Sequence, residues 1–254
     1  MMLEFIGTGP ALLVSGTQRI LAVADLHLGI ESDLDRHGLH FRSRTKERRE
    51  RLEACIRATS PDILVILGDL KHGVPFTTRQ EHREIPPFID MLRSLVPVRL
   101  VPGNHDVGIE HFFDPAELLP KEGAVIDGAG YVHGHMYPDP SLAGMLIIAG
   151  HHHPVVSLRD EVGCALRSPA YLFSPLDGAC LGFPAVAEGG SASRVIFIPA
   201  FNELTGYDIQ KTLRDPFSPL SRCMRREETE VLLADGTFIG PASALEGHEP
   251  NPES

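Results

Sequence analysis

The chain has 254 residues, 43% hydrophobic and 22% charged, with a formal net charge of −11 at pH 7. This length gives one large domain or two small ones with a sizeable core, and the acidic balance works against sequence-independent binding of nucleic acid, which needs clustered cations. No apolar run approaches the roughly 20 residues that cross a bilayer, and the N-terminus does not resemble a signal peptide, so we expect a cytoplasmic protein with no membrane association.

The first half of the chain alternates strand-like and helix-like segments. Glycine-rich turns separate three short apolar runs, and a continuous apolar run between Pro61 and Gly68 is typical of a buried strand. Prolines open the segment PPFIDMLRSL, as they often open helices. In chain order, we expect strands near 3–7, 11–15 and 19–24, a helix over 42–58, a strand over 60–70, a charged loop or helix start from 77, a helix over 86–95 and a strand over 96–103.

From Gly123 onward the segments become short and mostly β. Successive apolar runs are AVIDG, GYVHG, GMLIIAG, VVSL, VGCALRSPAYLF and RVIFIPAF, and EVLLADGTFIG has the pattern of a final hairpin with Asp235-Gly236 at its turn. Together the two halves predict an α/β fold with two sheets face to face and helices outside. We expect one domain over residues 1–240, and a disordered tail over 241–254 because that segment is acidic and contains proline.

The four cysteines, Cys55, Cys164, Cys180 and Cys223, are scattered and form no CxxC pair. This spacing argues against a disulfide framework or a cysteine zinc site, and it suits a reducing compartment. Cys55 falls in a predicted helix, where a buried thiol is expected.

Basic residues crowd one helical segment, RSRTKERRERLEACIR, with acidic residues between them. A solvated helix face with ion pairs four residues apart is one interpretation, and a phosphate-facing patch is the other. The basic residues are Arg42, Arg44, Lys46, Arg48, Arg49 and Arg51.

Histidine is abundant, with 13 residues, and much of it follows strand-like segments. Five of these apolar runs break into Asp, Asn or His, and the carboxyl ends of strands in a layered α/β fold converge on one edge. The residues in question are Asp25, His27, Asp69, His72, Asn104, His105, Asp106, His133, His135, His151, His152 and His153.

Carboxylates, neutral imidazoles and one amide oxygen, with no thiolate, suit Mn, Fe, Co, Ni or Zn. Two such metals a few ångströms apart need a bridging carboxylate, and Asp69 is the natural choice. A pair of metals can grip a phosphoryl group and activate water for in-line attack. The pattern therefore favours a binuclear site that acts on phosphate esters.

The ordered motifs DxH, GDxxH, GNHD, HGH and GHxH, over roughly residues 20–210, resemble the calcineurin-like metallophosphoesterase superfamily. The stretches GDLKH and PAFNELTGYDI look most like small SbcD-related archaeal phosphoesterases. This resemblance implies the calcineurin-like phosphoesterase fold, a four-layer αββα sandwich of two mixed β-sheets flanked by helices.

The resemblance also implies roles for individual residues. One metal would be held by Asp25, His27 and His153, and the other by Asn104, His133 and His151, with Asp69 bridging both. His105 would face the substrate, stabilising phosphoryl charge or protonating the leaving oxygen, while Asp106 orients its ring.

Three histidines have more than one interpretation. His72 is either a loop residue near the site or a substrate contact. His135 is either the ligand in place of His133 or a group that supports the ligands, and we expect the second because His133 falls first after its strand. His152 points away from its neighbours in an extended segment, toward solvent or toward the back of the ligands.

We therefore expect a hydrolase of phosphate mono- or diesters, with nucleotides or nucleic acid among its substrates, and with two divalent ions, Mn first and Fe, Zn, Ni or Co as alternatives. One alternative is an SbcD-related DNA nuclease subunit, although the acidity of the chain disfavours tight DNA binding by the chain alone. Another is a metal-binding interaction module without catalysis, but all the core motif positions are filled. The oligomeric state stays open.

Overall fold

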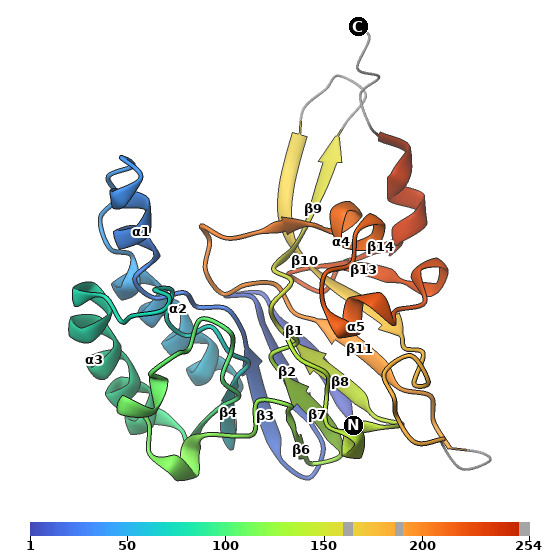
Figure 1. Cartoon of the computed structure of the whole chain (residues 1–254), viewed down its shortest axis with the longest axis horizontal. Coiled ribbons are helices and arrows are strands. Elements are labelled where there is room, and N and C mark those ends of the chain that lie inside the picture. Colours follow the sequence, from blue (N-terminus) through green and yellow to red (C-terminus); the bar gives the residue numbers. More distant parts are fainter. Residues whose placement is uncertain (160–164, 186–189, 249–254) are drawn as a thin grey trace, which may run out of the picture.

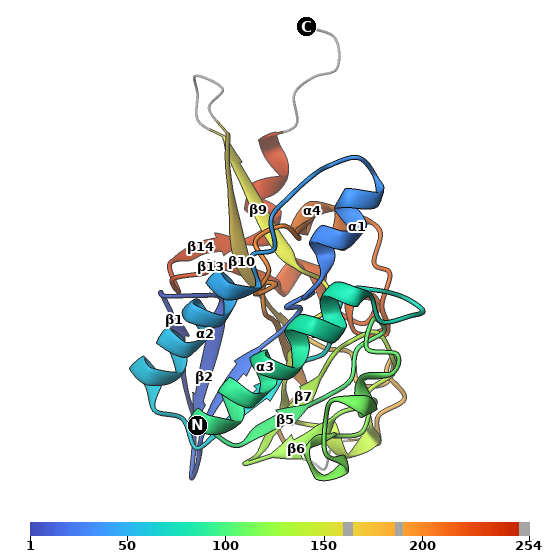
Figure 2. The ribbon, with the colours of Figure 1, turned by 90° about the vertical axis from the view of Figure 1, so that its left-hand side faces the viewer.

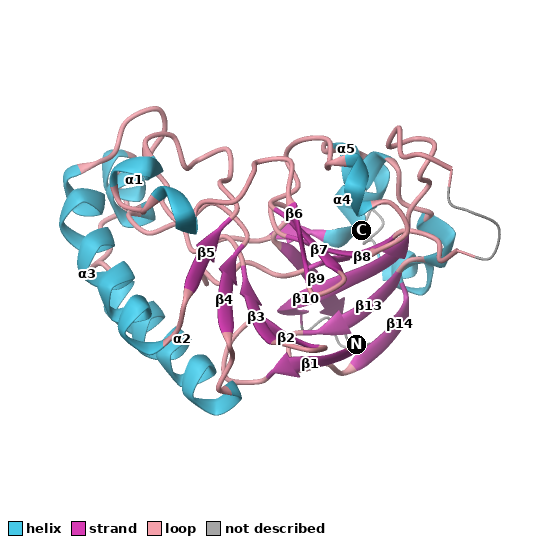
Figure 3. Ribbon diagram, turned by 90° about the horizontal axis from the view of Figure 1, so that it is seen from below, coloured by secondary structure: helices cyan, strands magenta, loops and turns pink. Residues whose placement is uncertain are grey.

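The computed structural model describes residues 1–159, 165–185 and 190–248. Two β-sheets pack against each other, and helices cover their outer faces (Figures 1 and 3). The predicted four-layer α/β sandwich of two mixed sheets is therefore confirmed.

The first sheet has the strand order β1-β2-β3-β4-β5. Strands β1 to β3 form an antiparallel meander, whereas β3, β4 and β5 run parallel and need helical crossovers. Helices α2 and α3 lie on its outer face (Figure 2). The elements are β1 (Met2–Ile6), β2 (Ala11–Ser15), β3 (Arg19–Val23), α1 (Ile30–Arg36), α2 (Thr45–Thr59), β4 (Ile63–Ile66), α3 (Arg79–Leu95) and β5 (Val98–Leu100).

Helix α3 is longer than the sequence predicts, because it begins at Arg79 and contains both Pro86 and Pro87. Thr78 and Glu81 form a capping box that starts the helix well before the prolines. Its apolar face, buried against the first sheet, stabilises the helix across the two positions where proline removes a backbone donor.

The second sheet has the order β12-β9-β10-β11-β8-β7-β6, with the β13–β14 hairpin attached to β10. Strands β7, β8 and β11 run parallel. The elements are β6 (Ala124–Ile126), β7 (Ala129–Val132), β8 (Leu146–Ala149), β9 (Pro154–Arg159), β10 (Ala165–Pro175), β11 (Arg194–Phe197), β12 (Tyr207–Asp208), α4 (Ile209–Arg214), α5 (Pro219–Arg222), β13 (Glu230–Leu233) and β14 (Phe238–Pro241). Short 3₁₀ turns cover Ile109–His111, Pro115–Glu117, Pro140–Leu142, Arg226–Glu228 and Ala242–His248.

Three apolar clusters separate the four layers. Phe88 and Leu52 belong to the cluster between the first sheet and its helices. Tyr171 and Ile148 belong to the cluster between the sheets. The third cluster, which includes Leu213, fills the space between the second sheet and α4 and α5. Burial on both faces explains why the central strands are continuous apolar runs.

One expectation about cysteine is wrong, because Cys180 and Cys223 form a disulfide with a Cα–Cα distance of 5.6 Å. The two residues are 43 positions apart, so no local spacing could reveal the pair. They meet because the turn after β10 packs against the end of α5, where the Asp177 N–H donates to the Cys223 carbonyl. Cys55 is buried and unpaired, as predicted, and Cys164 lies outside the described residues.

The C-terminal segment is partly ordered. Pro241 ends β14, and Ala242–His248 form a 3₁₀ turn in which Ala242 is buried, so the structure departs from the predicted tail at these positions. The rest of that tail lies outside the described residues.

None of the helices in the described part of the chain combines the length and hydropathy that a bilayer crossing requires. The cytoplasmic location stays a prediction.

The basic segment is mainly a solvated helix face. Lys46 pairs with Glu50 and Arg57 with Glu53, four residues apart and exposed, as one interpretation expected. Arg48 and Arg51 are exceptions, because the Arg48 side chain is fully buried and the partly buried Arg51 side chain lies over the Phe201 ring.

Candidate metal centre

The predicted convergence of strand ends is present in the structure. Asp25 and His27 follow β3, Asp69 follows β4 and Asn104 follows β5 in the first sheet, and the histidine motifs follow β7 and β8 in the second. Because these strands are parallel within each sheet, their carboxyl ends lie along one edge.

One group of donor atoms comes from Asp25, His27, Asp69 and His153, which lie within 4.8 Å of one another. The two Nε2 atoms of His27 and His153 face each other at 3.3 Å. His153 Nε2 lies 3.3 Å from Asp25 Oδ1, and His27 Nε2 lies 3.7 Å from Asp69 Oδ2. These are the residues expected to hold one metal, together with the expected bridge.

A second group comes from Asp69, His133 and His151, again within 4.8 Å. His133 Nε2 lies 3.5 Å from Asp69 Oδ2 and 3.0 Å from Asn104 Oδ1, so the amide oxygen belongs to the same cluster. Asp69 is the carboxylate common to both groups.

The donor set fits divalent metal ions. Asp25 Oδ1 is buried and has no hydrogen-bond partner among the described residues, although it faces imidazole nitrogens. Burial, followed by the charges of neighbouring histidines, lowers the pKa of His27 and brings that of His151 to about 2. Both imidazoles are therefore neutral at pH 7, with lone pairs free to bind a cation.

The pKa shifts of the carboxyl groups also favour a bound cation. Burial is the main cause that raises the pKa of Asp69, and burial followed by the Asp69 charge raises the pKa of Asp106 to about 6. Burial lowers the pKa of His153, but the charges of Asp25 and Asp69 outweigh it and raise the pKa overall. A bound cation would offset the cost of placing these carboxylates in the interior.

The backbone of the site is held in unusual conformations. In the described part of the chain, seven residues other than glycine have φ between 43° and 70°. Five of them are candidate ligands: Asp25, His27, Asp69, His151 and His153. Such left-handed conformations are costly for side-chain-bearing residues and concentrate at functional sites.

Close backbone approach explains the glycine in the GNHD motif. A Cβ on Gly103 would lie 2.2 Å from Asp69 Oδ1 and 2.5 Å from the Asp69 backbone nitrogen. Only glycine lets the loop after β5 reach the loop after β4.

Gly103→Ala is therefore expected to displace Asp69, weaken metal binding and destabilise the fold by about 1–3 kcal/mol. Gly7→Ala is the matched control, because a Cβ there meets nothing within 4 Å. Thermal unfolding and metal titration of both variants test this, and equal behaviour of the two would show that the close approach does not matter.

Hydrogen bonds to main-chain carbonyls orient two of the rings. His133 Nδ1 donates to the Leu67 carbonyl at 2.8 Å, which turns its Nε2 toward Asp69. His105 Nδ1 donates to the His72 carbonyl at 2.6 Å, and the His105 backbone N–H donates to Asp69 Oδ1 at 2.8 Å.

The structure corrects the expected role of Asp106. Its carboxylate accepts hydrogen bonds from the backbone N–H groups of Lys71 and Gly103, at 3.2 and 2.8 Å, and so ties the loop after β4 to the loop after β5. The ring of His105 is instead oriented by the His72 carbonyl, because the Asp106 side chain turns back under the loop.

His72 lies in the site. Its Nδ1 is 3.2 Å from His27 Nδ1, and its ring stacks on that of His105 with 5.3 Å between the ring centroids. His27, His72 and His105 form a third group of close donor atoms. This group has no carboxylate, and the Nδ1 of His105 is already bonded to a carbonyl, so we do not place a metal there.

His135 and His152 flank the second group. His135 packs on His133, and burial lowers its pKa to about 4. His152 is fully buried rather than in solvent, because the face opposite its neighbours packs on the core of the second sheet. Its Nε2 lies 3.1 Å from Ser218 Oγ, and its ring stacks on Phe217.

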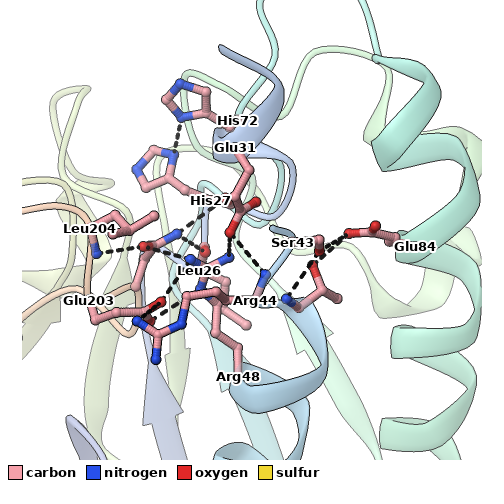
Figure 4. A network of polar contacts seen from close by, with 12 residues as sticks. Leu26, His27, Glu31, Ser43, Arg44, Arg48, His72, Glu84, Glu203 and Leu204 are labelled. Carbon is pink, nitrogen blue, oxygen red and sulfur yellow. Dashed lines mark hydrogen bonds and ion pairs between the residues drawn. The ribbon is translucent and has the colours of Figure 1, made fainter. Parts of the chain in front are cut away.

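Sequence reasoning missed a polar group behind the site. Glu31, Arg48 and Asn202 are buried, and Glu203 lies at the exposed edge of the group (Figure 4 labels Glu31, Arg48 and Glu203). The basic segment gives no sign that Arg48 is buried, and the PAFNELTGYDI stretch assigns no role to Asn202. No local sequence pattern indicates this group, because its residues come from distant segments of the chain.

The family model for calcineurin-like phosphoesterases matches residues 18–162, more than half of the chain, so this protein belongs to that family. It is a metal-dependent hydrolase, and divalent metal ions are implied by its family. The closer likeness to SbcD-related archaeal phosphoesterases stays a prediction.

One solved structure supports the fold. The nuclease MPE of Pseudomonas putida superimposes with a TM-score of 0.57 at 19% identity, over 94% of this chain and 94% of that chain. YfcE, a phosphoesterase from E. coli, gives a TM-score of 0.36 at 17% identity, over 56% of this chain and 73% of its own. A search of curated proteins found no match.

Proposed function

We propose that this protein is a phosphoesterase with a binuclear metal centre that hydrolyses phosphate mono- or diesters. The observation that carries the proposal is that Asp69 belongs to both donor groups, one with Asp25, His27 and His153 and the other with His133 and His151. Asn104 completes the second group through its contact with His133.

Two bound divalent ions, with Mn as the first candidate, would supply positive charge for the phosphoryl oxygens and lower the pKa of a water molecule that attacks phosphorus. The chain's own residues then fix the geometry. Asp69, anchored by the His105 backbone N–H, sets the distance between the two groups. The hydrogen bond between His133 Nδ1 and the Leu67 carbonyl presents Nε2 to the centre.

His105 is the proposed acid or charge-stabilising group. Because its Nδ1 donates to the His72 carbonyl, only Nε2 is left to contact substrate. In the protonated ring, Nε2 can donate to a phosphoryl oxygen or to the leaving oxygen. His105 is half-buried beside the first donor group, so the ring is both held and accessible.

Among the esters covered by this proposal, the phosphodiesters of nucleic acid are the second candidate substrate. It is favoured by the nuclease MPE, whose fold the chain shares over nearly its full length. The net charge of −11 opposes tight binding of nucleic acid by this chain alone, so a nuclease role would fit best with a basic partner subunit. An interaction module without catalysis is disfavoured, because the donor residues and His105 are all in place.

Protein loaded with Mn is expected to hydrolyse bis-(p-nitrophenyl) phosphate or p-nitrophenyl phosphate near neutral pH. Chelation should reduce the rate by about 10²-fold or more, and added Mn should restore it. Release of p-nitrophenol measures both.

The same preparation, screened with single-stranded DNA, RNA, cyclic nucleotides and phosphomonoesters, identifies the substrate class. If protein that contains two metals turns over none of these esters, the proposed activity is wrong.

A further inference from the structure

The segment 201–207, which follows β11 and ends at the first residue of β12, crosses from the second sheet to the carboxyl edge of the first sheet. Figure 1 shows it as the orange loop that extends toward the blue N-terminal half. The backbone N–H of Phe201 donates to the Ala24 carbonyl at 2.8 Å, and that of Asn202 donates to the Asp25 carbonyl at 3.3 Å. At its other end, the Tyr207 N–H donates to the His153 carbonyl at 2.8 Å.

The Asn202 side chain adds two further contacts. Its Nδ2 donates to the Leu26 carbonyl at 2.8 Å and to the His27 carbonyl at 3.2 Å. Segment 201–207 therefore contacts the backbone of Asp25, His27 and His153, the three residues that with Asp69 form the first donor group. Among the hydrogen bonds of the described residues, none joins this segment to Asn104, His133 or His151.

The orientation of the Asn202 amide is fixed by its surroundings. Its Oδ1 accepts from Arg48 Nη2 at 3.2 Å and from the Leu204 N–H at 2.8 Å, so the Nδ2 end must face the carbonyls. Asn202 is only 1% exposed, so these contacts are shielded from bulk solvent.

Arg48 is held in turn by two carboxylates. Its Nη1 donates to Glu31 at 2.8 Å, and its Nη2 donates to Glu203 at 3.0 Å (Figure 4). Glu31 also accepts from the Arg44 N–H, so the start of α2 is tied to the start of α1. A fully buried guanidinium is tolerated only when its donors are paired in this way, which makes the group rigid.

All three supported residues have backbone conformations that need support. Asp25, His27 and His153 have φ of 56°, 43° and 44°, values that persist only when the surrounding structure determines them. Paired carbonyls on either side of His27 keep its ring directed at His153.

We propose that Asn202, fixed by Arg48, is a positioning residue that sets the affinity for one metal of the pair, the metal held by Asp25, His27 and His153. This inference rests on the proposed binuclear centre. If so, changing a residue that contacts neither metal weakens the binding of one metal and leaves the binding of the other unchanged.

The test is a titration of Asn202→Ala with Mn, in which calorimetry measures the affinity for each ion and electron paramagnetic resonance detects the bound ions. Wild type is expected to bind two ions. In the variant, one ion should bind about 10- to 100-fold more weakly, as is typical when a partner behind a ligand is removed, while the other binds unchanged.

Asn202→Asp provides a second, nearly isosteric variant. The carboxylate can still accept from Arg48 and Leu204 but cannot donate to the carbonyls of Leu26 and His27, so the same selective loss is expected. Thr229→Ala is the control for a general structural effect. Thr229 is equally buried and loses hydrogen bonds to Ser174 and Arg225, far from the site, so this variant should keep both metals.

A double-mutant comparison assigns the affected metal. Adding Asn202→Ala to His153→Ala should leave the affinity for the other ion unchanged, because both act on the same ion, whereas adding it to Asn104→Ala should weaken both ions. If wild type binds fewer than two ions, the proposed binuclear centre is wrong. If wild type binds two, but the Asn202 variants keep both affinities, weaken both equally or fail to fold, the inference about Asn202 is wrong.

Discussion

Asp69→Ala is expected to lose both metals and to reduce kcat/KM for an activated phosphodiester by about 10⁴-fold or more. Asp69 Oδ2 lies 3.7 Å from His27 Nε2 and 3.5 Å from His133 Nε2, so one carboxylate serves both donor groups. Its loss also frees the His105 backbone N–H, which donates to Oδ1. Metal ions contribute several kcal/mol to stabilising transition-state charge, and each 1.36 kcal/mol is a tenfold change in rate.

Metal content after dialysis and steady-state kinetics measure the effect of this change. Asp62→Ala is a matched control, because Asp62 lies just before β4, away from the site, and accepts a hydrogen bond from the Arg19 N–H. The control should keep both metals and most of the activity. Normal binding of two metals by Asp69→Ala would show that Asp69 is not the bridge.

His105→Ala is expected to keep both metals and to lose turnover by about 10²- to 10⁴-fold, the range typical of a positioned acid or base. Its side chain contacts the His72 carbonyl and packs on the rings of His27 and His72. It lies outside the two groups that contain Asp69. The substitution therefore removes a group that faces substrate and leaves the ligands in place.

Asn104→Ala is the natural comparison for His105→Ala, because the two residues are neighbours in the chain. Asn104 contacts His133 in the second donor group, so its removal should weaken one metal, whereas removal of His105 should spare both. Titration of each variant with Mn separates the two roles. Loss of a metal from His105→Ala would mean that the His27–His72–His105 group binds a cation after all.

Most secondary structure could be predicted because local patterns determine it. The three N-terminal strands lie within a residue of their predicted positions, since glycine-containing turns punctuate the apolar runs. Helix α3 was predicted too short, because the capping box at Thr78 and burial of the apolar face outweigh the prolines. The Cys180–Cys223 pair depends on how two distant segments pack, which no local pattern shows.

The convergence of the donor residues could be predicted for a related reason, whereas their division into two groups was implied by the resemblance to calcineurin-like phosphoesterases. The donor residues follow strands directly, and parallel strands bring their carboxyl ends together. The supporting contacts could not be predicted. Asp106 binds backbone rather than the His105 ring, His152 faces a packed core, and Asn202 reaches the first sheet from a segment more than a hundred residues away.

The most direct test of the central claim is the electron paramagnetic resonance spectrum of wild-type protein titrated with Mn. A centre in which Asp69 bridges two ions predicts two Mn per chain and a spectrum that becomes exchange-coupled as the second ion binds. A single bound Mn, or two ions that remain magnetically independent at full occupancy, would contradict the shared role of Asp69.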